Sequence, residues 1–289
     1  MYVIAGATGR VGSATAARLL DEGADVRVLV RNEGDAASWV ARGAEARVVS
    51  LGDRTALGTV IAGCEGMFVL LPFDLGVGDL DWYADGLIAS IAGAVADARV
   101  PRVVMLSSGG ADLPIGTGPI TGLHRLEVAL RGAGTVLTAL RSGHFQEKVG
   151  DVIELARESG VYPVFAASAD VPLPMVATRD LGEVAAVELL AQAVSSEAVD
   201  VVGPAYTERD VAEVLGRVLG RELDVQLVPE ESWAPALMEA GFRPHVAASL
   251  AELYRADEAG MLRPRGDRHV RVSTPIEQTI ERMLQSVRS

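Results

Sequence analysis

The chain has 289 residues, of which 49% are hydrophobic, and this length can bury a sizeable core in two unequal lobes. The net charge of −13 gives the surface a negative field that repels nucleic acid backbones and anionic lipid. We therefore expect neither nucleic acid nor membrane partners. In agreement, no apolar stretch has the roughly 20 residues that a membrane-spanning helix needs.

The single cysteine, Cys64, cannot form an internal disulfide, and no His or Cys residues have the spacing of a metal site. We therefore expect a reducing, cytoplasmic compartment and no bound metal. The chain opens on an apolar run without a preceding basic segment, so we expect no export. An oligomer is compatible with the sequence but is not indicated by it.

The first half alternates short apolar runs with amphipathic stretches. The apolar runs cover residues 2–5, 25–30, 46–49, 67–71, 102–106 and 136–140. This alternation predicts a parallel sheet with helices on both faces, joined by right-handed crossovers. We therefore predict an α/β protein with a doubly wound Rossmann domain that holds a dinucleotide over residues 1–145.

The pattern changes after residue 145. Residues 161–176 are irregular and contain three prolines, and the later part is mainly helical, over 180–194, 207–219, 230–240 and 244–259. One further strand is expected at 199–202. We predict that residues 146–289 form a smaller, mainly α lobe that binds substrate, and that residues 176–203 return to the Rossmann sheet.

A glycine turn follows the first predicted strand and opens the first predicted helix. In this context Gly6 permits a tight turn, Gly9 lets the backbone approach a pyrophosphate, and Gly12 lets helix and strand pack closely. The alternative is a structural turn without a ligand. The residues that we expect at the cofactor are Gly6, Thr8, Gly9, Arg10, Val11 and Gly12.

The second predicted strand ends in Val30, Arg31 and Asn32, where NAD-preferring sites carry an acidic residue for the ribose 2′-hydroxyl. Arg31 could instead form charge-assisted bonds to a 2′-phosphate, with Arg10 as a second cation. The cofactor expected is therefore NADP(H). The alternative is that Arg31 is a solvated surface residue.

The glycine turn, Arg31 and three further segments together resemble the NmrA-like family, an atypical branch of the short-chain dehydrogenase/reductase superfamily. These segments are residues 51–53, 104–109 and 140–145, and the resemblance covers nearly the whole chain. It implies that Asp53 contacts adenine, that Leu71 and Pro72 line the nucleotide cleft, and that Ser107, Ser108 and Gly143 border the nicotinamide. All lie at the carboxyl ends of predicted parallel strands, where open α/β sheets bind ligands. Asp53 is equally suited to cap a helix over 54–62.

Typical members of the wider superfamily use Tyr and Lys four residues apart to protonate the developing alkoxide. The only lysine here, Lys148, is not preceded by a tyrosine at that spacing. The related isoflavone-reductase-like proteins use a lysine on the helix after the fifth strand, and similarity places Arg125 there, beside His124. We expect His124 to act as general acid, because histidine titrates near neutrality, and Arg125 to bind ribose or phosphate.

Four residues are candidates for substrate contact. His144 and Phe145 follow the sixth predicted strand, near the expected nicotinamide, while Tyr162 and Trp233 belong to the second lobe that should cover the substrate. Core packing is the alternative for each of them.

The function expected is NADPH-dependent reduction of a small molecule, a quinone, enone or related conjugated carbonyl. Hydride addition to such an electrophile gives a delocalised anion, so the missing Tyr and Lys are tolerable. Biosynthesis of an aromatic natural product is one setting for such a reaction. The alternatives are a non-catalytic, NADP(H)-sensing regulator and a non-redox lyase or isomerase on the same fold.

Overall fold

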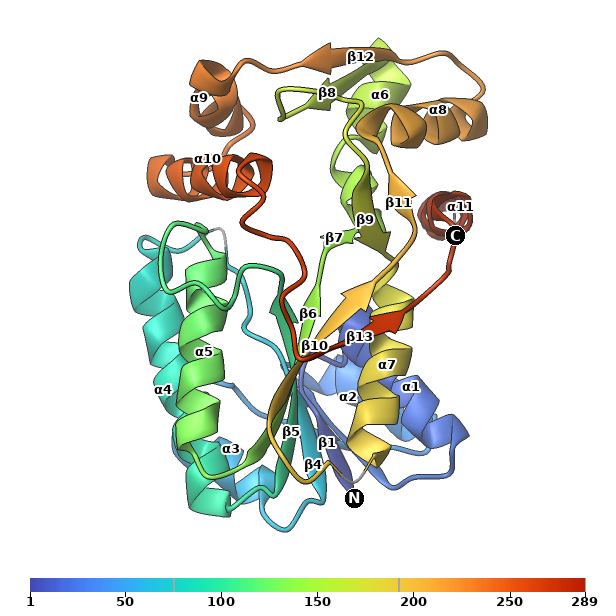
Figure 1. Ribbon diagram of the computed structural model, residues 1–289. Helices are drawn as coiled ribbons and strands as arrows, with labels where there is room; N and C mark the ends of the chain where they lie inside the picture. Colours follow the sequence, from blue (N-terminus) through green and yellow to red (C-terminus); the bar gives the residue numbers. More distant parts are fainter. Residues whose placement is uncertain (75, 192, 289) are drawn as a thin grey trace.

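One eight-stranded sheet forms the centre of the lower half of the molecule in Figure 1, and all of its neighbouring strands run parallel. Its strand order is β13-β10-β6-β5-β4-β1-β2-β3. The computed structural model describes residues 1–74, 76–191 and 193–288. The strands are β1 (Tyr2–Ile4), β2 (Val26–Val30), β3 (Glu45–Val48), β4 (Gly66–Val69), β5 (Arg102–Ser108), β6 (Val136–Ser142), β10 (Glu197–Val202) and β13 (Arg268–Arg271).

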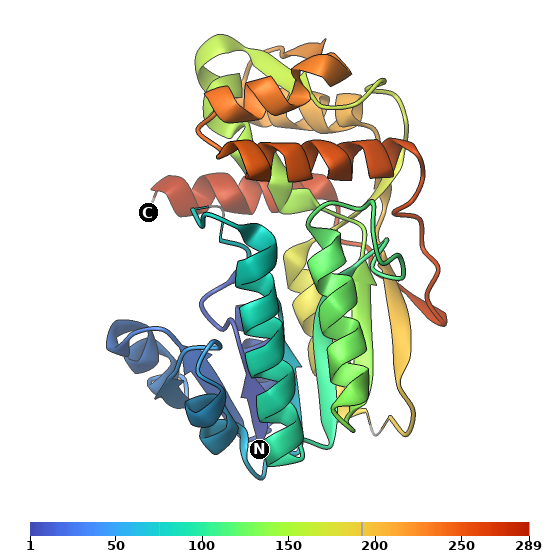
Figure 2. The same cartoon turned by 90° about the vertical axis from the view of Figure 1, so that its left-hand side faces the viewer.

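Helices cover both faces of this sheet (Figures 1 and 2). One layer contains α1 (Arg10–Asp21), α2 (Glu33–Val40) and α7 (Thr178–Leu190), and the other contains α3 (Arg54–Ile61), α4 (Leu80–Ala98) and α5 (Ile120–Gly132). Successive residues of a strand point to opposite faces of the sheet. Ile4 therefore packs in the core beside α1, α2 and α7, while Val3 and Ala5 pack in the core beside α3, α4 and α5. The predicted Rossmann fold is therefore confirmed, with both faces of its parallel sheet buried.

The order of strands reverses between β1 and β4. The chain first builds β1, β2 and β3 toward one edge and then returns to place β4, β5 and β6 on the other side of β1. Ligands of open α/β sheets bind beyond the carboxyl ends of the strands at such a switch point. The fold therefore directs attention to the loops that follow β1, β4, β5 and β6.

The second lobe lies beyond these carboxyl ends. Its strands form a three-stranded sheet of β7 (His144–Phe145), β9 (Leu173–Val176) and β11 (Ala205–Tyr206), and a pair of β8 (Val161–Val164) and β12 (Asp224–Leu227). Its helices are η1 (Gln146–Asp151), α6 (Ile153–Ser159), α8 (Glu208–Leu219), η2 (Glu230–Ser232), α9 (Trp233–Glu239), α10 (Pro244–Glu258) and α11 (Ile276–Arg288). A third apolar core, which includes Val149, Leu215 and Ile280, holds this lobe together.

The division of the chain differs from the predicted boundary in one respect. Helix α7 and strand β10 do return to the sheet, as residues 176–203 were expected to do, but β13 returns as well. This strand carries three charged or titratable side chains, and two of them meet carboxylates of β10: Arg268 pairs with Glu197, and His269 with Asp200. These ion pairs allow a polar segment to form an edge strand.

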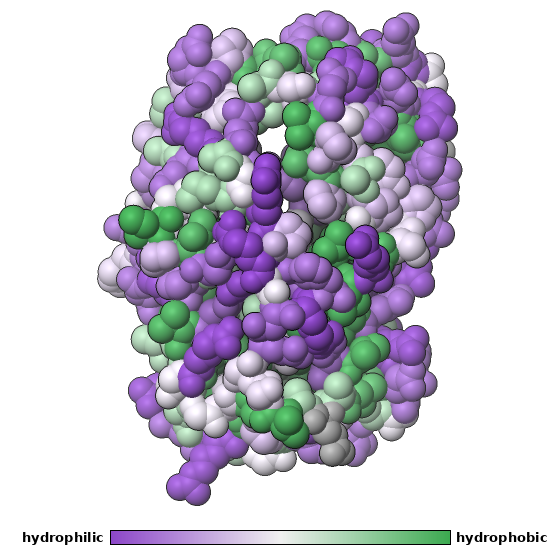
Figure 3. All heavy atoms as spheres, in the orientation of Figure 1, coloured by the Kyte–Doolittle hydropathy of each residue, from purple (hydrophilic) through white to green (hydrophobic). Residues whose placement is uncertain are grey.

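The surface agrees in character with the acidic composition. The face seen in Figure 3 is largely hydrophilic, and its apolar side chains form small separate patches. Within the described residues, no helix is long and apolar enough to cross a bilayer. In the same part of the chain, no group of His, Cys, Asp and Glu side chains is arranged to hold a metal ion.

Candidate cofactor and substrate site

The glycine turn lies between β1 and α1. Gly6 has a φ of +68°, and its carbonyl accepts a hydrogen bond of 2.9 Å from the Gly9 backbone N–H. A Cβ atom at Gly12 would lie 2.3 Å from the Gly6 carbonyl oxygen, so only glycine permits this close approach. Thr8, Gly9 and Arg10 are exposed, and Gly9 has no side chain to cap the first N–H groups of α1. The turn therefore fits a pyrophosphate, whose oxygens these N–H groups can bind.

Two arginines flank this end of the sheet. Arg31 follows β2 directly, and both Arg31 and Arg10 are exposed. Within the described part of the chain, neither guanidinium has a hydrogen-bond or ion-pair partner. By contrast, Asp53 is engaged as the N-cap of α3, because its side chain accepts a 3.0 Å hydrogen bond from the Ala56 N–H. The capping role of Asp53 is present, and its adenine contact stays a prediction.

The residues predicted at the nicotinamide differ in exposure. Ser108 is half-buried and Gly143 is exposed. A Cβ atom at Gly143 would lie 2.8 Å from the Pro174 carbonyl oxygen. Ser107 is only 2% exposed, and its hydroxyl donates a 2.7 Å hydrogen bond to Glu127. Its hydroxyl is thus directed to α5, which corrects the expectation that Ser107 borders a ligand.

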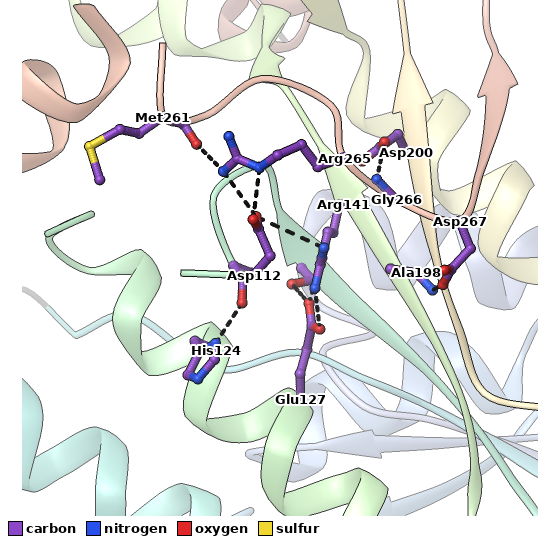
Figure 4. Close-up of polar contacts among 12 residues, drawn as sticks. Asp112, His124, Glu127, Arg141, Ala198, Asp200, Met261, Arg265, Gly266 and Asp267 are labelled. Carbon is purple, nitrogen blue, oxygen red and sulfur yellow. Dashed lines mark hydrogen bonds and ion pairs between the residues drawn. The ribbon is translucent and has the colours of Figure 1, made fainter. Parts of the chain in front are cut away.

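A buried ion pair lies beneath this region and was not predicted from the sequence. Arg141 on β6 and Glu127 on α5 form a bidentate pair with hydrogen bonds of 3.0 and 2.7 Å, and both side chains are buried (Figure 4). The guanidinium Nη1 of Arg141 also lies 4.0 Å from the carboxylate of Asp112. A bidentate pair of this kind fixes β6 relative to α5 with defined geometry.

Asp112 joins this pair to the second lobe. Arg265, on the segment that follows α10, donates two hydrogen bonds of 2.7 and 3.1 Å to its carboxylate (Figure 4). Burial alone would raise the pKa of Asp112, but the hydrogen bond from Arg265 and the positive charges of Arg265 and Arg141 lower it below the ordinary value. The loop after β5 is therefore held to the second lobe by a charged contact.

The two residues predicted to be catalytic both have protein partners. His124 donates its Nδ1 proton to the Ala111 carbonyl oxygen at 2.8 Å, since a carbonyl can only accept (Figure 4). Arg125 forms a 2.7 Å hydrogen bond to Asp81 and lies 3.0 Å from Asp85, both on α4. The structure thus gives His124 a role in holding the loop and pairs Arg125 with carboxylates, and the catalytic role of His124 and the ribose or phosphate contact of Arg125 stay predictions.

A pocket of about 290 Å³ lies between the two lobes. Helix α10 crosses above the ends of α4 and α5 and closes one side of it (Figure 2). The predicted cleft residues Leu71 and Pro72 and the paired Arg125 all lie in its wall. The remaining wall residues are Phe73, Leu80, Asp81, Tyr83, Ala84, Pro114, Ile115, Gly116, Gly118, Pro119, Thr121, Gly122, Ser249 and Glu252. The wall thus combines apolar side chains with polar groups, among them one arginine and two carboxylates.

His144 meets the second lobe directly. Its Nε2 atom lies 3.0 Å from a carboxylate oxygen of Asp257 on α10, and the two side chains are 21% and 23% exposed. Phe145, by contrast, packs against the core between the sheet and the layer of α1 and α7. His144 thus contacts the second lobe and Phe145 packs partly against the core, and the substrate contact of each stays a prediction.

The two candidates from the second lobe are buried. Tyr162 is 4% exposed and donates a 2.7 Å hydrogen bond to Glu208, and its pKa is raised by burial and by the negative charge of that carboxylate. Trp233 is 1% exposed and donates its indole N–H to the Val228 carbonyl. Neither side chain offers a surface to a ligand, so packing replaces the predicted substrate contact.

The parallel sheet, its switch point and the open glycine turn define a Rossmann-type dinucleotide-binding protein. The chain belongs to the NmrA-like family, which it matches over residues 2–284. The resemblance noted in the sequence is thereby confirmed.

Two curated relatives are oxidoreductases by name. The (4-alkanoyl-5-oxo-2,5-dihydrofuran-3-yl)methyl phosphate reductase of Streptomyces griseus is 31% identical over 264 residues, which cover 90% of this chain and 88% of the relative. Agroclavine dehydrogenase of Claviceps fusiformis is 31% identical over 166 residues, covering 56% of this chain and 55% of the relative.

Solved structures share the fold over nearly the full length. Triphenylmethane reductase from Citrobacter sp. has a TM-score of 0.82 at 21% identity and covers 98% of this chain and 99% of its own. An NADPH-dependent quinone oxidoreductase from Escherichia coli, crystallised with NADPH, has a TM-score of 0.77 at 22% identity, with coverage of 98% and 100%. At this identity the likeness establishes the fold.

Proposed function

We propose that this protein is an NADPH-dependent reductase that acts on a quinone, enone or related conjugated carbonyl compound. The observation that carries the proposal is the open glycine turn at the N-terminus of α1 together with Arg31, an exposed guanidinium without a partner among the described residues. The Streptomyces relative and the Citrobacter and Escherichia coli structures described above, each similar over most of this chain, are reductases or oxidoreductases by name. A reduced nicotinamide, when bound, would supply the hydride.

The strand order gives the cofactor a direction. A pyrophosphate on the glycine turn lies over β1, and Arg31 at the end of β2 would bind a 2′-phosphate on the adenosine side. The nicotinamide half would then extend the other way, over β4, β5 and β6, beside Ser108 and Gly143. The pocket beneath α10 adjoins this end of β4, since Leu71 and Pro72 lie in its wall.

The substrate class follows from chemistry and from the Streptomyces relative. The name of that relative describes a ring in which a carbon–carbon double bond is conjugated with a carbonyl group, and which carries an acyl substituent. Hydride addition to such a system leaves a delocalised anion, so placement of the substrate against the nicotinamide supplies much of the catalysis. The pocket wall offers apolar side chains together with a few polar groups, a combination that suits a small conjugated carbonyl compound.

The test is to mix purified protein with NADPH and a panel of quinones, enones and acylated unsaturated lactones and to follow the absorbance of the reduced nicotinamide. We expect oxidation of NADPH with at least one class of acceptor. NADPH binding without turnover of any acceptor would instead identify a sensor. No binding of NADPH would overturn the cofactor assignment as well.

A further inference from the structure

The pair formed by His144 and Asp257 joins the end of the central sheet to the helix that covers the pocket. Strand β6 ends at Ser142, and His144 follows after a single glycine, while Asp257 lies on α10, which also lends Ser249 and Glu252 to the pocket wall. The two side chains are partly exposed and their nearest atoms, Nε2 and Oδ2, are 3.0 Å apart. Within the described residues, the other ring nitrogen, Nδ1, has no hydrogen-bond partner.

The position of this imidazole matches the expected path of the nicotinamide. Neighbouring strands lie about 4.8 Å apart, so β6 is three spacings, roughly 14 Å, from β1 and the pyrophosphate turn. Arg31, directly after β2, lies on the opposite side of β1. His144 therefore lies near the nicotinamide end of the expected cofactor path, on the sheet side of the helix that closes the pocket.

We propose that His144 donates the proton that completes reduction of the substrate and that Asp257 positions it. This inference rests on the function proposed above. When NADPH delivers a hydride to the conjugated carbonyl, one π pair of the substrate moves to form an enolate. The enolate then takes a proton from Nδ1 of the imidazolium, which becomes neutral and regains a proton from water. The substrate gains a hydride and a proton in total, so charge and electrons balance.

Asp257 favours this role by its position. A carboxylate oxygen 3.0 Å from Nε2 favours the ring tautomer that carries the Nε2 proton and leaves Nδ1 directed away from this contact. An aspartate that orients a histidine in this way is a recurring element of acid–base catalysis.

The other ionisable groups around His144 are engaged elsewhere. Strand β9, which pairs with β7, carries none between Leu173 and Val176. On η1, Glu147 accepts the backbone N–H and the hydroxyl of Thr178, and Lys148 lies over the ring of Tyr254. The carboxylate that contacts this imidazole is Asp257, on α10.

The alternative donors are weaker. The ring of His124 is held by the uncharged Ala111 carbonyl, whereas that of His144 lies beside a carboxylate, and Arg125 is paired with Asp81 and Asp85. A guanidinium is in any case a poor proton donor, because its pKa is too high. Among the residues considered, His144 alone combines a titratable group, partial exposure and a carboxylate partner at this end of the sheet.

The test compares two kinds of hydride acceptor in His144→Gln, Asp257→Asn and a matched control. An enone or quinone needs a proton after hydride addition, whereas a triarylmethyl dye cation becomes neutral by accepting the hydride alone. The control is His269→Gln, because His269 forms a similar pair with Asp200, at 3.1 Å, on the edge strand β13. NADPH affinity is measured for every variant by direct titration.

We expect His144→Gln to lower kcat for the conjugated carbonyl by about 100-fold, a typical contribution of a general acid, and to leave kcat for the dye and the NADPH affinity unchanged. Asp257→Asn should give a smaller loss with the same selectivity, and His269→Gln should behave as the wild type. If the wild type reduces carbonyl acceptors but not the dye, the dependence of kcat on pH is compared instead. With the carbonyl acceptor, the kcat of the wild type should fall as pH rises, and the kcat of His144→Gln should not.

A second measurement needs neither cofactor nor substrate. NMR spectra of isotope-labelled histidine distinguish the two tautomers, and neutral His144 should carry its proton on Nε2 in the wild type but lose this single tautomer in Asp257→Asn. Wild-type kcat in His144→Gln, equal losses with both acceptors, or an Nδ1–H tautomer in the wild type would each overturn the proposal. If the wild type fails to oxidise NADPH with every acceptor of the panel, the proposed function itself is overturned.

Discussion

At the scale of single residues, the proposed preference for NADP(H) assigns the 2′-phosphate to the exposed guanidinium of Arg31. We expect Arg31→Ala to weaken NADPH binding roughly 10- to 100-fold, because hydrogen bonds to charged groups contribute about 1.5–3 kcal/mol, and to spare NADH. Arg217→Ala, at an exposed arginine of α8 in the other lobe, is the control. Calorimetric titration with both nucleotides checks this, and an equal loss for both would show that Arg31 does not read the 2′-phosphate.

Gly12 makes a second prediction at this scale. A methyl group there would lie 2.3 Å from the Gly6 carbonyl, so Gly12→Ala must separate α1 from the turn. We expect a loss of about 1–3 kcal/mol in the free energy of unfolding, with weaker NADPH binding. Gly86→Ala is the matched control, since a Cβ atom at this position of α4 meets no atom within 4 Å. Denaturant unfolding should show no loss for that control, and a similar loss in both would contradict the argument.

The residues that sequence reasoning identified and those it missed differ in a physical way. The geometry of the glycine turn follows from a short local pattern, because Gly6, Gly9 and Gly12 constrain one another within a single turn. The Glu127 and Arg141 pair does not, since both residue types normally lie at the surface and the partners come from different elements. His144 was identified as a substrate contact, but its carboxylate partner is more than 100 positions away and has no local signal.

At the scale of elements, the loop after β5 is held to the second lobe by Asp112 and Arg265. The pKa of Asp112 is lowered in the folded protein, so the contact stabilises the fold above the unfolded pKa of about 3.9 and is lost as pH falls through the lower folded value. We expect Asp112→Asn to lower the free energy of unfolding by roughly 1–3 kcal/mol at neutral pH. Unfolding measured from neutral to acidic pH should show this difference shrinking below about pH 4.

A suitable control for that series is Asp97→Asn. Asp97 forms an equally short pair with Arg54, but both side chains are more than half exposed, so the contact should contribute little to stability. The explanation would fail if Asp112→Asn stayed equally destabilised in acid, because the missing interaction would then not depend on the ionised carboxylate.

Most strands of the first half could be predicted because their apolar runs are buried, whereas β3, at the edge of the sheet, is partly exposed. The predicted strand over 102–106 became β5 (Arg102–Ser108), and the run over 25–30 became β2 (Val26–Val30). Strands β8 and β13 escaped prediction for separate reasons: β8 contains Pro163, and β13 is made mostly of charged residues. Both depend on pairing with distant segments, which periodicity within one segment does not reveal.

At the scale of the whole molecule, cofactor binding should raise the thermal stability of the folded protein. A ligand that binds only the folded state at 100 times its Kd stabilises it by about 2.7 kcal/mol. We therefore expect NADPH to raise the Tm by several degrees and NADH, at the same concentration, to raise it less. Thermal unfolding followed by circular dichroism checks this, and an identical rise with both nucleotides would contradict the preference for NADP(H).

The chain passes repeatedly between the sheet and the second lobe, and this arrangement restricts how the protein can change over evolution. The second lobe is assembled from residues 143–177, 203–267 and 272–288, with α7, β10 and β13 of the sheet layers between them. A single genetic exchange therefore cannot replace the second lobe as a module. New specificities would instead arise by substitution of individual side chains within a frame whose connectivity stays fixed.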